Sequence, residues 1–135
     1  MIKLAIDLGS SVTKIFKIGS GIVLAEASCV AVTTGTDTVK AIGEEAKRLI
    51  GKTAEFTTIV FPVFEADIVN GNMAAVMLSY FLKKIGIGRA QARRTEAVFG
   101  VPCGAQDALL DKYYRLAEAC GIGSVSFVEV PFLAA

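Results

Sequence analysis

Apolar and polar residues alternate with a period of two along the first quarter of the chain. This pattern predicts strands at Lys3 to Leu8, Thr13 to Ile18 and Ile22 to Val32. Gly19-Ser20-Gly21 is typical of a tight turn between the second and third strands. Three consecutive strands with short connections predict an antiparallel meander.

The remaining pattern alternates between helical and strand periods. Thr33 to Thr38 is polar and predicts a loop, and Pro62 limits Ile59 to Val63 to an edge or irregular strand. Gly51 and Gly121 are placed to end helices, and Pro131 suits the start of another. The pattern predicts helices at Glu44 to Ile50, from Asn70 or Asn72 to about Ile85, and at Asp107 to Ala119, with strands at Glu96 to Val101 and Ser124 to Val128.

A meander followed by alternating helices and strands is the order of elements in a ribonuclease H-like α/β fold. The later strands are expected to be parallel, because right-handed helical crossovers connect them. Residues 1–135 are expected to form a single domain of this type. Ligands of such sheets usually bind at the ends of the central strands, and Asp7 lies at the end of the first one.

Composition narrows the function classes. The net charge of +1 gives no reason to expect a nucleic-acid partner, and no apolar run approaches the ~20 residues of a membrane span. The hydrophobic content of 53% is high for a small domain, which predicts a dense core or an apolar face that normally has a partner. Cys29, Cys103 and Cys120 are widely spaced, and the chain has no His. This pattern argues against a zinc site or a disulfide framework and for a reducing cytoplasm, and the first residues do not read as a signal peptide.

The turn after the first strand carries the candidate chemistry. Asp7 suits the water shell of Mg²⁺, and Gly9 permits a positive φ and the close approach of a phosphate. Ser10 and Ser11 can donate hydrogen bonds to an anion, and Lys14 can add positive charge. The plainer interpretation is an ordinary hairpin whose polar side chains satisfy turn amides.

The segment Asp7-Leu8-Gly9-Ser10-Ser11 resembles the first phosphate loop of the actin, Hsp70 and sugar-kinase superfamily. Several further segments are similar, in order, to the MreB-like bacterial actins: Gly21 to Ser28, Ala41 to Thr53, Met77 to Lys84, Phe99 to Gly104 and Val128 to Ala135. The stretch from Gly43 to Thr53 favours MreB over the pilus-assembly actins, the division actins and the diol-dehydratase reactivating chaperones. The resemblance runs end to end and covers the first of that family's two large domains.

The resemblance implies half of an actin-like fold that binds ATP with Mg²⁺ and takes part in filament assembly for cell shape. It implies that Asp7 holds Mg²⁺ through water, while Gly9, Ser10, Ser11 and the Val12 amide cradle the terminal phosphates. Lys14 matches a phosphate-contacting Lys of conventional actin, although MreB proteins typically have another residue there. The implied location is the cytoplasm, or the inner face of the cell membrane.

Two departures from the family pattern bear on catalysis. The last strand of MreB-like chains reads Glu-Glu-Pro, and the second Glu helps to position the attacking water. Here the match is Glu129-Val130-Pro131, and a valine can neither accept a proton nor orient water. Strand alternation places Glu129 on the opposite side. The second phosphate loop and the adenosine pocket belong to the other domain, and losing even ~3 kcal/mol of contacts weakens binding about a hundredfold. We therefore expect no appreciable ATP hydrolysis by this chain alone.

Other functions stay open at this point. A non-hydrolysing scaffold, capping or interaction module is the main alternative, and the partner is another copy or a separate actin-like half. A ribonuclease H-like nuclease needs several converging carboxylates, which the strand end at Val101 to Gly104 does not supply. A membrane surface is an alternative partner for the basic stretch from Lys83 to Arg94, but Ile85 and Ile87 are its only apolar candidates, so a solvated loop is favoured.

Overall fold

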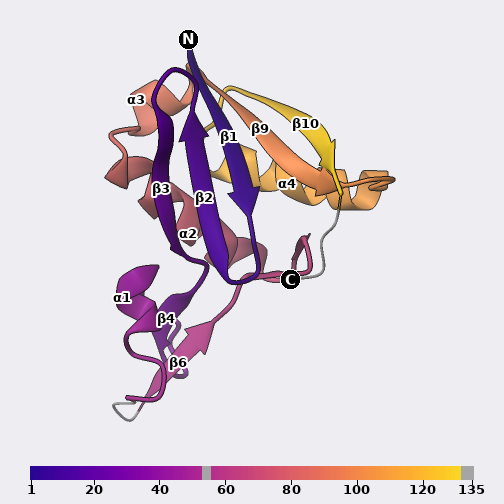
Figure 1. The fold of residues 1–135 in the computed structure, drawn as a ribbon. Helices are drawn as coiled ribbons and strands as arrows, with labels where there is room; N and C mark the ends of the chain where they lie inside the picture. The colour runs from indigo at the N-terminus through magenta and orange to yellow at the C-terminus, as the bar shows by residue number, and fades with distance from the viewer. Residues whose placement is uncertain (53–55, 132–135) are drawn as a thin grey trace.

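The computed structural model describes residues 1–52 and 56–131, and a five-stranded sheet forms its centre (Figure 1). The strand order is β10-β9-β1-β2-β3. The strands are β1 (Ile2–Leu8), β2 (Val12–Lys17), β3 (Gly21–Ala27), β9 (Thr95–Pro102) and β10 (Ser124–Val130). β1, β2 and β3 form the expected antiparallel meander, while β9 runs parallel to both β1 and β10.

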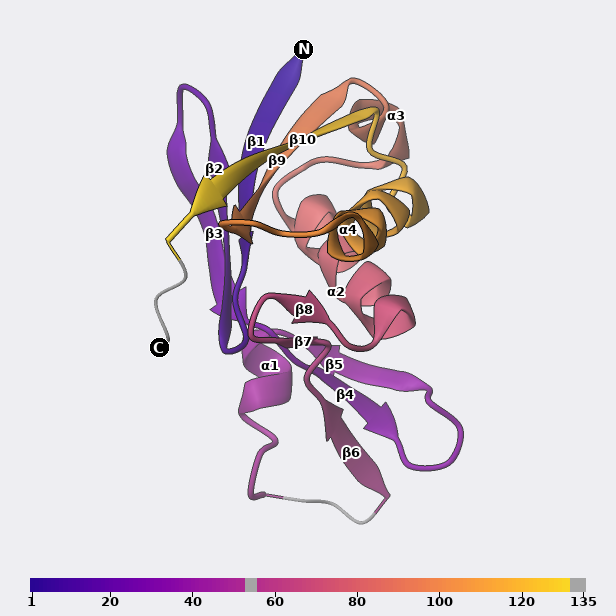
Figure 2. The ribbon, with the colours of Figure 1, turned by 90° about the vertical axis from the view of Figure 1, so that its right-hand side faces the viewer.

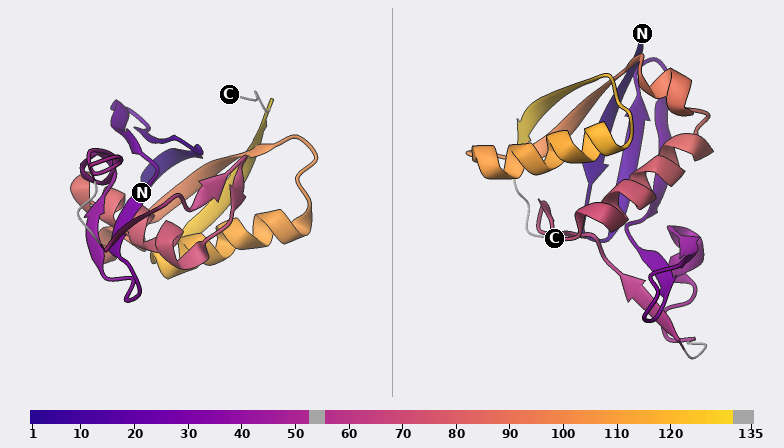
Figure 3. Two further views of the ribbon diagram at one scale, coloured as in Figure 1. Left: turned by 90° about the horizontal axis from the view of Figure 1, so that it is seen from below. Right: turned by 180° about the vertical axis from the view of Figure 1, so that it is seen from behind.

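Helices cover one face of this sheet, as the view from behind in Figure 3 shows. They are α2 (Gly71–Lys84), the short α3 (Arg89–Ala92) and α4 (Asp107–Ala119). Leu4, Ile6 and Leu8 of β1 point into the core beneath the helices, as the alternation predicted. Of the two candidate caps of α2, Asn70 takes the role, because its side chain accepts a hydrogen bond from the Met73 N–H at 3.1 Å.

A second, smaller sheet extends from one end of the main sheet (Figure 2). Its strand order is β5-β4-β6, and its strands are β4 (Val30–Thr33), β5 (Val39–Ile42) and β6 (Thr57–Val60). The prediction of one strand from Ile22 to Val32 is therefore wrong. The chain leaves the main sheet after Ala27, and Ser28 and Cys29 are buried where it passes between the sheets.

Several further elements differ from the sequence prediction. The helix expected at Glu44 to Ile50 is a single turn, α1 (Glu44–Lys47), after which i→i+3 hydrogen bonds tighten the chain. A hairpin of β7 (Val63–Phe64) and β8 (Asp67–Ile68) follows Pro62. β5, this hairpin and α3 were not predicted. The helix expected from Pro131 onward falls in residues 132–135, outside the described residues.

The face of the main sheet opposite the helices carries exposed apolar residues, which is one of the two outcomes that the composition left open. The register places Phe16 opposite Ala5 and close to Ile22, while Val128 and Val130 continue the same face on β10. Phe16 is 37% exposed and Ile22 is 58% exposed.

Candidate functional site

The six residues singled out from the sequence line one pocket of about 540 Å³. It lies where the β1–β2 turn meets the carboxyl ends of β9 and β10 and the β7–β8 hairpin, at the lower end of the main sheet in Figure 1. The lining comprises Asp7, Leu8, Gly9, Ser10, Ser11, Val12 and Lys14 from the turn, Glu65 and Ala66 from the hairpin, Gly100, Val101 and Pro102 from β9, and Val130 and Pro131 at the end of β10.

Gly9 shapes the turn for a reason other than the one expected. The described glycines with a positive φ do not include Gly9, so the turn does not use the positive φ that a glycine permits. A Cβ atom at this position would instead lie 2.4 Å from the Val12 carbonyl oxygen. The Gly9 N–H donates to that same oxygen at 3.0 Å, which closes the turn. Only a residue without a side chain fits this approach.

Asp7 and Lys14 occupy directly opposed positions of the β1–β2 pair. Directly opposed residues of an antiparallel pair project from the same face of the sheet, and both side chains are exposed at the pocket. Leu8 and Thr13, the next pair, turn toward the buried side. The hairpin register thus places one carboxylate and one ammonium group at the pocket while it fills the core behind them.

The two serines of the turn are held by different hydrogen bonds. The Ser10 hydroxyl accepts a hydrogen bond from the Glu65 N–H at 2.8 Å, so its own proton is left to donate. The Ser11 carbonyl accepts from the Ser28 N–H at 2.9 Å, which ties the turn to the start of the small sheet. Within residues 1–52 and 56–131, the Ser10 and Ser11 amides have no acceptor. Both amides can therefore donate to an anion in the pocket.

The β7–β8 hairpin also lines the pocket, and the sequence pattern did not predict it. Its turn residues, Glu65 and Ala66, have φ values of 47° and 66°, the left-handed region that usually requires Gly or Asn. The Tyr113 hydroxyl donates to the Ala66 carbonyl at 2.7 Å, and Lys112 forms a salt bridge with Asp67 at 2.8 Å. These contacts from α4 hold the strained turn over the pocket.

Tyr113 connects the hairpin to the strands that carry the pocket floor. Its ring packs against Phe99 of β9 and Phe127 of β10, with centroids 5.2 and 6.2 Å away. Burial raises the Tyr113 pKa to about 12, and the nearby carboxylates of Asp67 and Asp7 add to the effect. The phenol is therefore a neutral hydrogen-bond donor at physiological pH.

The end of β10 places Val130 at the pocket and Glu129 on the other side. Val130 pairs with Pro102, and Glu129 pairs with Val101, which is buried beneath the helices. The side chain of Val130 lies over Gly100, since a Cβ built there would contact its methyl groups at 3.6 and 3.7 Å. The prediction that Glu129 faces away from Asp7 is confirmed by this register.

The basic stretch before β9 is separate from this pocket. Ile87 is 5% exposed and belongs to the core, and Ile85 is half-buried. The two isoleucines therefore do not form an exposed apolar pair. Within the described ranges, no helix has both the length and the apolar character to cross a membrane.

The donor set suits the phosphates of a nucleotide with its magnesium ion. Two amides and the Ser10 and Ser11 hydroxyls can donate to phosphate oxygens, and Lys14 adds a positive charge. Asp7 supplies a carboxylate of the kind that binds Mg²⁺ through its waters. The close turn at Gly9 leaves the backbone open to a ligand without an intervening side chain.

Comparison with known proteins shows the family of this chain. A family model described as MreB/Mbl protein matches residues 1–135. The chain belongs to the MreB/Mbl family. It is 32% identical to the cell shape-determining protein MreB of Haemophilus influenzae and 29% identical to that of Escherichia coli, over 98% of this chain in each case. It spans 39% of the length of each of these relatives.

Solved structures establish the fold as one half of an actin-like, ribonuclease H-like α/β fold. MreB5 of Spiroplasma citri bound to AMPPNP superposes with a TM-score of 0.84 at 21% identity, covering 95% of this chain and 38% of that one. The structure of the same protein bound to ADP superposes with a TM-score of 0.83. The MamK double helical filament gives 0.77 at 19% identity, covering 95% of this chain and 40% of that one.

Proposed function

We propose that this chain forms the phosphate-binding half of a nucleotide site in an actin-like cytoskeletal protein of the MreB/Mbl family. In this role residues 1–135 are one domain, equivalent to the first domain of that family, in the cytoplasm or on the inner membrane face. It takes part in filament assembly for cell shape, with another copy or a second actin-like half as partner. The observation that carries the proposal is the pocket in which Asp7, Gly9 to Val12 and Lys14 meet.

Each residue has a distinct role in this proposal. Gly9, Ser10, Ser11 and the Val12 amide hold the terminal phosphates, and Lys14 neutralises part of their charge. Asp7 holds Mg²⁺ through its water shell. The Glu65 N–H occupies a lone pair of the Ser10 hydroxyl, so Ser10 approaches a phosphate as a donor. When Mg²⁺ is bound, its positive charge would reduce the repulsion between the Asp7 carboxylate and the phosphates.

The likeness to nucleotide-bound neighbours supports ATP as the ligand. The Spiroplasma citri MreB5 structures contain ADP and AMPPNP. The filament role rests on the names of relatives, namely the cell shape-determining MreB proteins and the MamK double helical filament.

The test is a thermal unfolding titration of the 135-residue chain with Mg-ATP. We expect a saturable rise of the melting temperature that grows with ligand concentration. Asp7→Ala should abolish the rise, whereas Asp111→Ala, an exposed carboxylate on α4, should keep it. ATP with EDTA should give a smaller rise, because the carboxylate then repels the phosphates. An equal rise in the wild type and Asp7→Ala would contradict the proposal.

Val130 favours a second candidate, a non-hydrolysing scaffold, capping or interaction module. The strand end that meets the pocket has a hydrocarbon side chain where the family pattern places the water-positioning carboxylate. A valine cannot activate water, so we expect phosphate release from the chain alone at the rate of buffer. Steady turnover that Asp7→Ala removes would refute this expectation. Nucleotide-dependent assembly, measured by sedimentation with and without Mg-ATP, separates the filament role from the scaffold role.

A further inference from the structure

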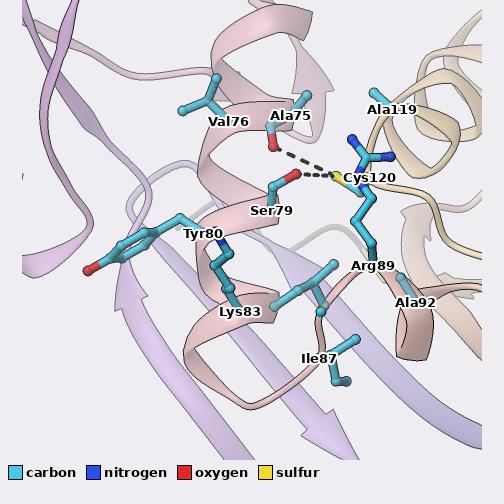
Figure 4. Close-up of a pocket in the computed structure, with 12 residues that line it drawn as sticks. Ala75, Val76, Ser79, Tyr80, Lys83, Ile87, Arg89, Ala92, Ala119 and Cys120 are labelled. Carbon is cyan, nitrogen blue, oxygen red and sulfur yellow. Dashed lines mark hydrogen bonds between the residues drawn. The ribbon is translucent and has the colours of Figure 1, made fainter.

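A second pocket, of about 530 Å³, lies on the helical side of the molecule, away from the β1–β2 turn (Figure 4). α2 forms one wall with Ala75, Ser79 and Lys83. Arg89 of α3 and Cys120, which follows α4, form the other side. Figure 4 shows that the arm of Arg89 runs along the pocket and ends beside Cys120.

The floor of this pocket is fixed and mainly apolar. The Ser79 hydroxyl donates to the Cys120 sulfur at 3.4 Å, and the Cys120 thiol donates to the Ala75 carbonyl at 3.7 Å. Burial raises the Cys120 pKa, with smaller opposing effects from the Ser79 hydrogen bond and the Arg89 charge, so the thiol stays neutral. The polar atoms of the floor are thus already engaged, and the remaining surface suits apolar side chains.

The charged groups around this floor are all cationic. Lys83 and Arg89 line the pocket, and among the described residues no Asp or Glu lines it. Within residues 1–52 and 56–131, neither Lys83 nor Arg89 forms a salt bridge, whereas Lys84 on the same helix is paired with the buried Glu26. An apolar floor beside two unpaired cations is complementary to an apolar surface that carries carboxylates.

We propose that this groove docks an acidic amphipathic helix of a partner protein. Ala75 and Ser79 are one turn apart on α2, so a second helix can approach closely there and seat its apolar side chains on the floor. Its carboxylates then pair with Arg89 and Lys83, in the helix-in-groove mode of recognition. The interaction is independent of the nucleotide pocket, which lies at the end of the main sheet.

The experiment measures fluorescence anisotropy of labelled helical peptides with the 135-residue chain. One peptide carries Leu at spacings of three and four residues and Glu at the flanking positions, and its twin carries Gln in place of every Glu. We expect the acidic peptide to bind about tenfold more tightly than its twin, and increasing salt to remove the difference. Arg89→Gln should weaken the acidic peptide about tenfold and leave the twin unchanged, whereas Arg93→Gln, outside the pocket, should change neither.

Substitutions that change the shape of the groove, and not its charge, test whether the peptides bind there. Ala75→Leu fills the floor and should weaken both peptides, whereas Phe16→Ser on the open sheet face should weaken neither. Each variant is first checked by thermal unfolding, and Ser79→Leu, which also fills the pocket, replaces Ala75→Leu if the latter does not fold. The proposal would be overturned if the two peptides bound equally well. It would also be overturned if Phe16→Ser, and not Arg89→Gln, weakened binding of the acidic peptide. Dimers in sedimentation velocity that Arg89→Gln abolishes would also overturn it, because the occupant would then be a second copy.

Discussion

Replacing Gly9 with alanine is the sharpest test of how the candidate phosphate loop is built. The new Cβ atom would lie 2.4 Å from the Val12 carbonyl oxygen, whereas real Cβ atoms essentially never come closer than 3.0 Å to such an atom. The clash is with backbone, so the turn must open, and the 3.0 Å hydrogen bond from the Gly9 N–H to that oxygen is lost or stretched. Overpacking of this kind typically costs about 1–3 kcal/mol.

For a chain of this size we expect Gly9→Ala to lower the melting temperature by roughly 3–10 °C. The rise produced by Mg-ATP should shrink as well, because the amides of Ser10 and Ser11 move with the turn. Circular dichroism during heating measures the first effect, and the nucleotide titration measures the second.

Gly71→Ala is the matched control. Gly71 is the first residue of α2, its added Cβ would meet nothing within 4 Å, and its φ is not positive. Alanine there should be neutral or should stabilise the chain by up to about 1 kcal/mol. A Gly9→Ala variant that melts with the wild type and keeps the full nucleotide response would refute the account of the turn.

Three further predictions concern other parts of the chain. Tyr113→Phe should cost about 1 kcal/mol at pH 8 by leaving the Ala66 carbonyl without its donor. The pKa of Tyr113 is about 12 in the folded chain and about 10 in the unfolded chain. The free energy of unfolding of the wild type, measured with urea, should therefore be constant below pH 10 and fall between pH 10 and 12. The Phe variant should lack this fall. Gly43→Ala should speed amide hydrogen exchange in α1 and β5, because its Cβ would lie 2.3 Å from the Glu26 carboxylate at a backbone φ of 72°; unchanged exchange would contradict this. Ellman's reagent at pH 8 should label the exposed Cys103 within minutes and the two buried thiols only on unfolding, so rapid labelling of all three would show that the packing is wrong.

The parts of the fold that follow local rules could be predicted from the sequence. Alternation in Lys3 to Leu8 identified both the strand and its buried face. The two candidate caps, Asn70 and Asn72, bracketed the start of α2, and the structure selects Asn70. The boundaries of α4 matched the prediction, since its apolar spacing is regular and Gly121 takes the left-handed conformation that ends it. The pocket residues from Asp7 to Lys14 were found because they lie together in the chain.

The failures occurred where tertiary contacts decide the local structure. The run from Ile22 to Val32 is apolar except for Glu26 and Ser28, and it shows no change of period at the residue where the chain passes from one sheet to the other. Ser28 marks the passage, because its hydroxyl bonds Thr13 at 2.7 Å in the interior. The β7–β8 hairpin was missed because Glu65 and Ala66 are not turn formers, and contacts from α4 hold them in place.

The pairing of β1 with β2 constrains which genetic changes this region can accept. The register pairs Asp7 with Lys14 at the pocket and Leu8 with Thr13 on the core side. Alternate residues of each strand therefore face the pocket and the core. β9 holds β1 on its other side, so a slip of one residue at the turn would move β2 and would turn Lys14 toward the core and Ile15 toward the open face. Substitutions at the exposed positions of Ser11 or Val12 leave the assignment intact. The length of this turn therefore decides which side chains of β2 reach the pocket and which fill the core.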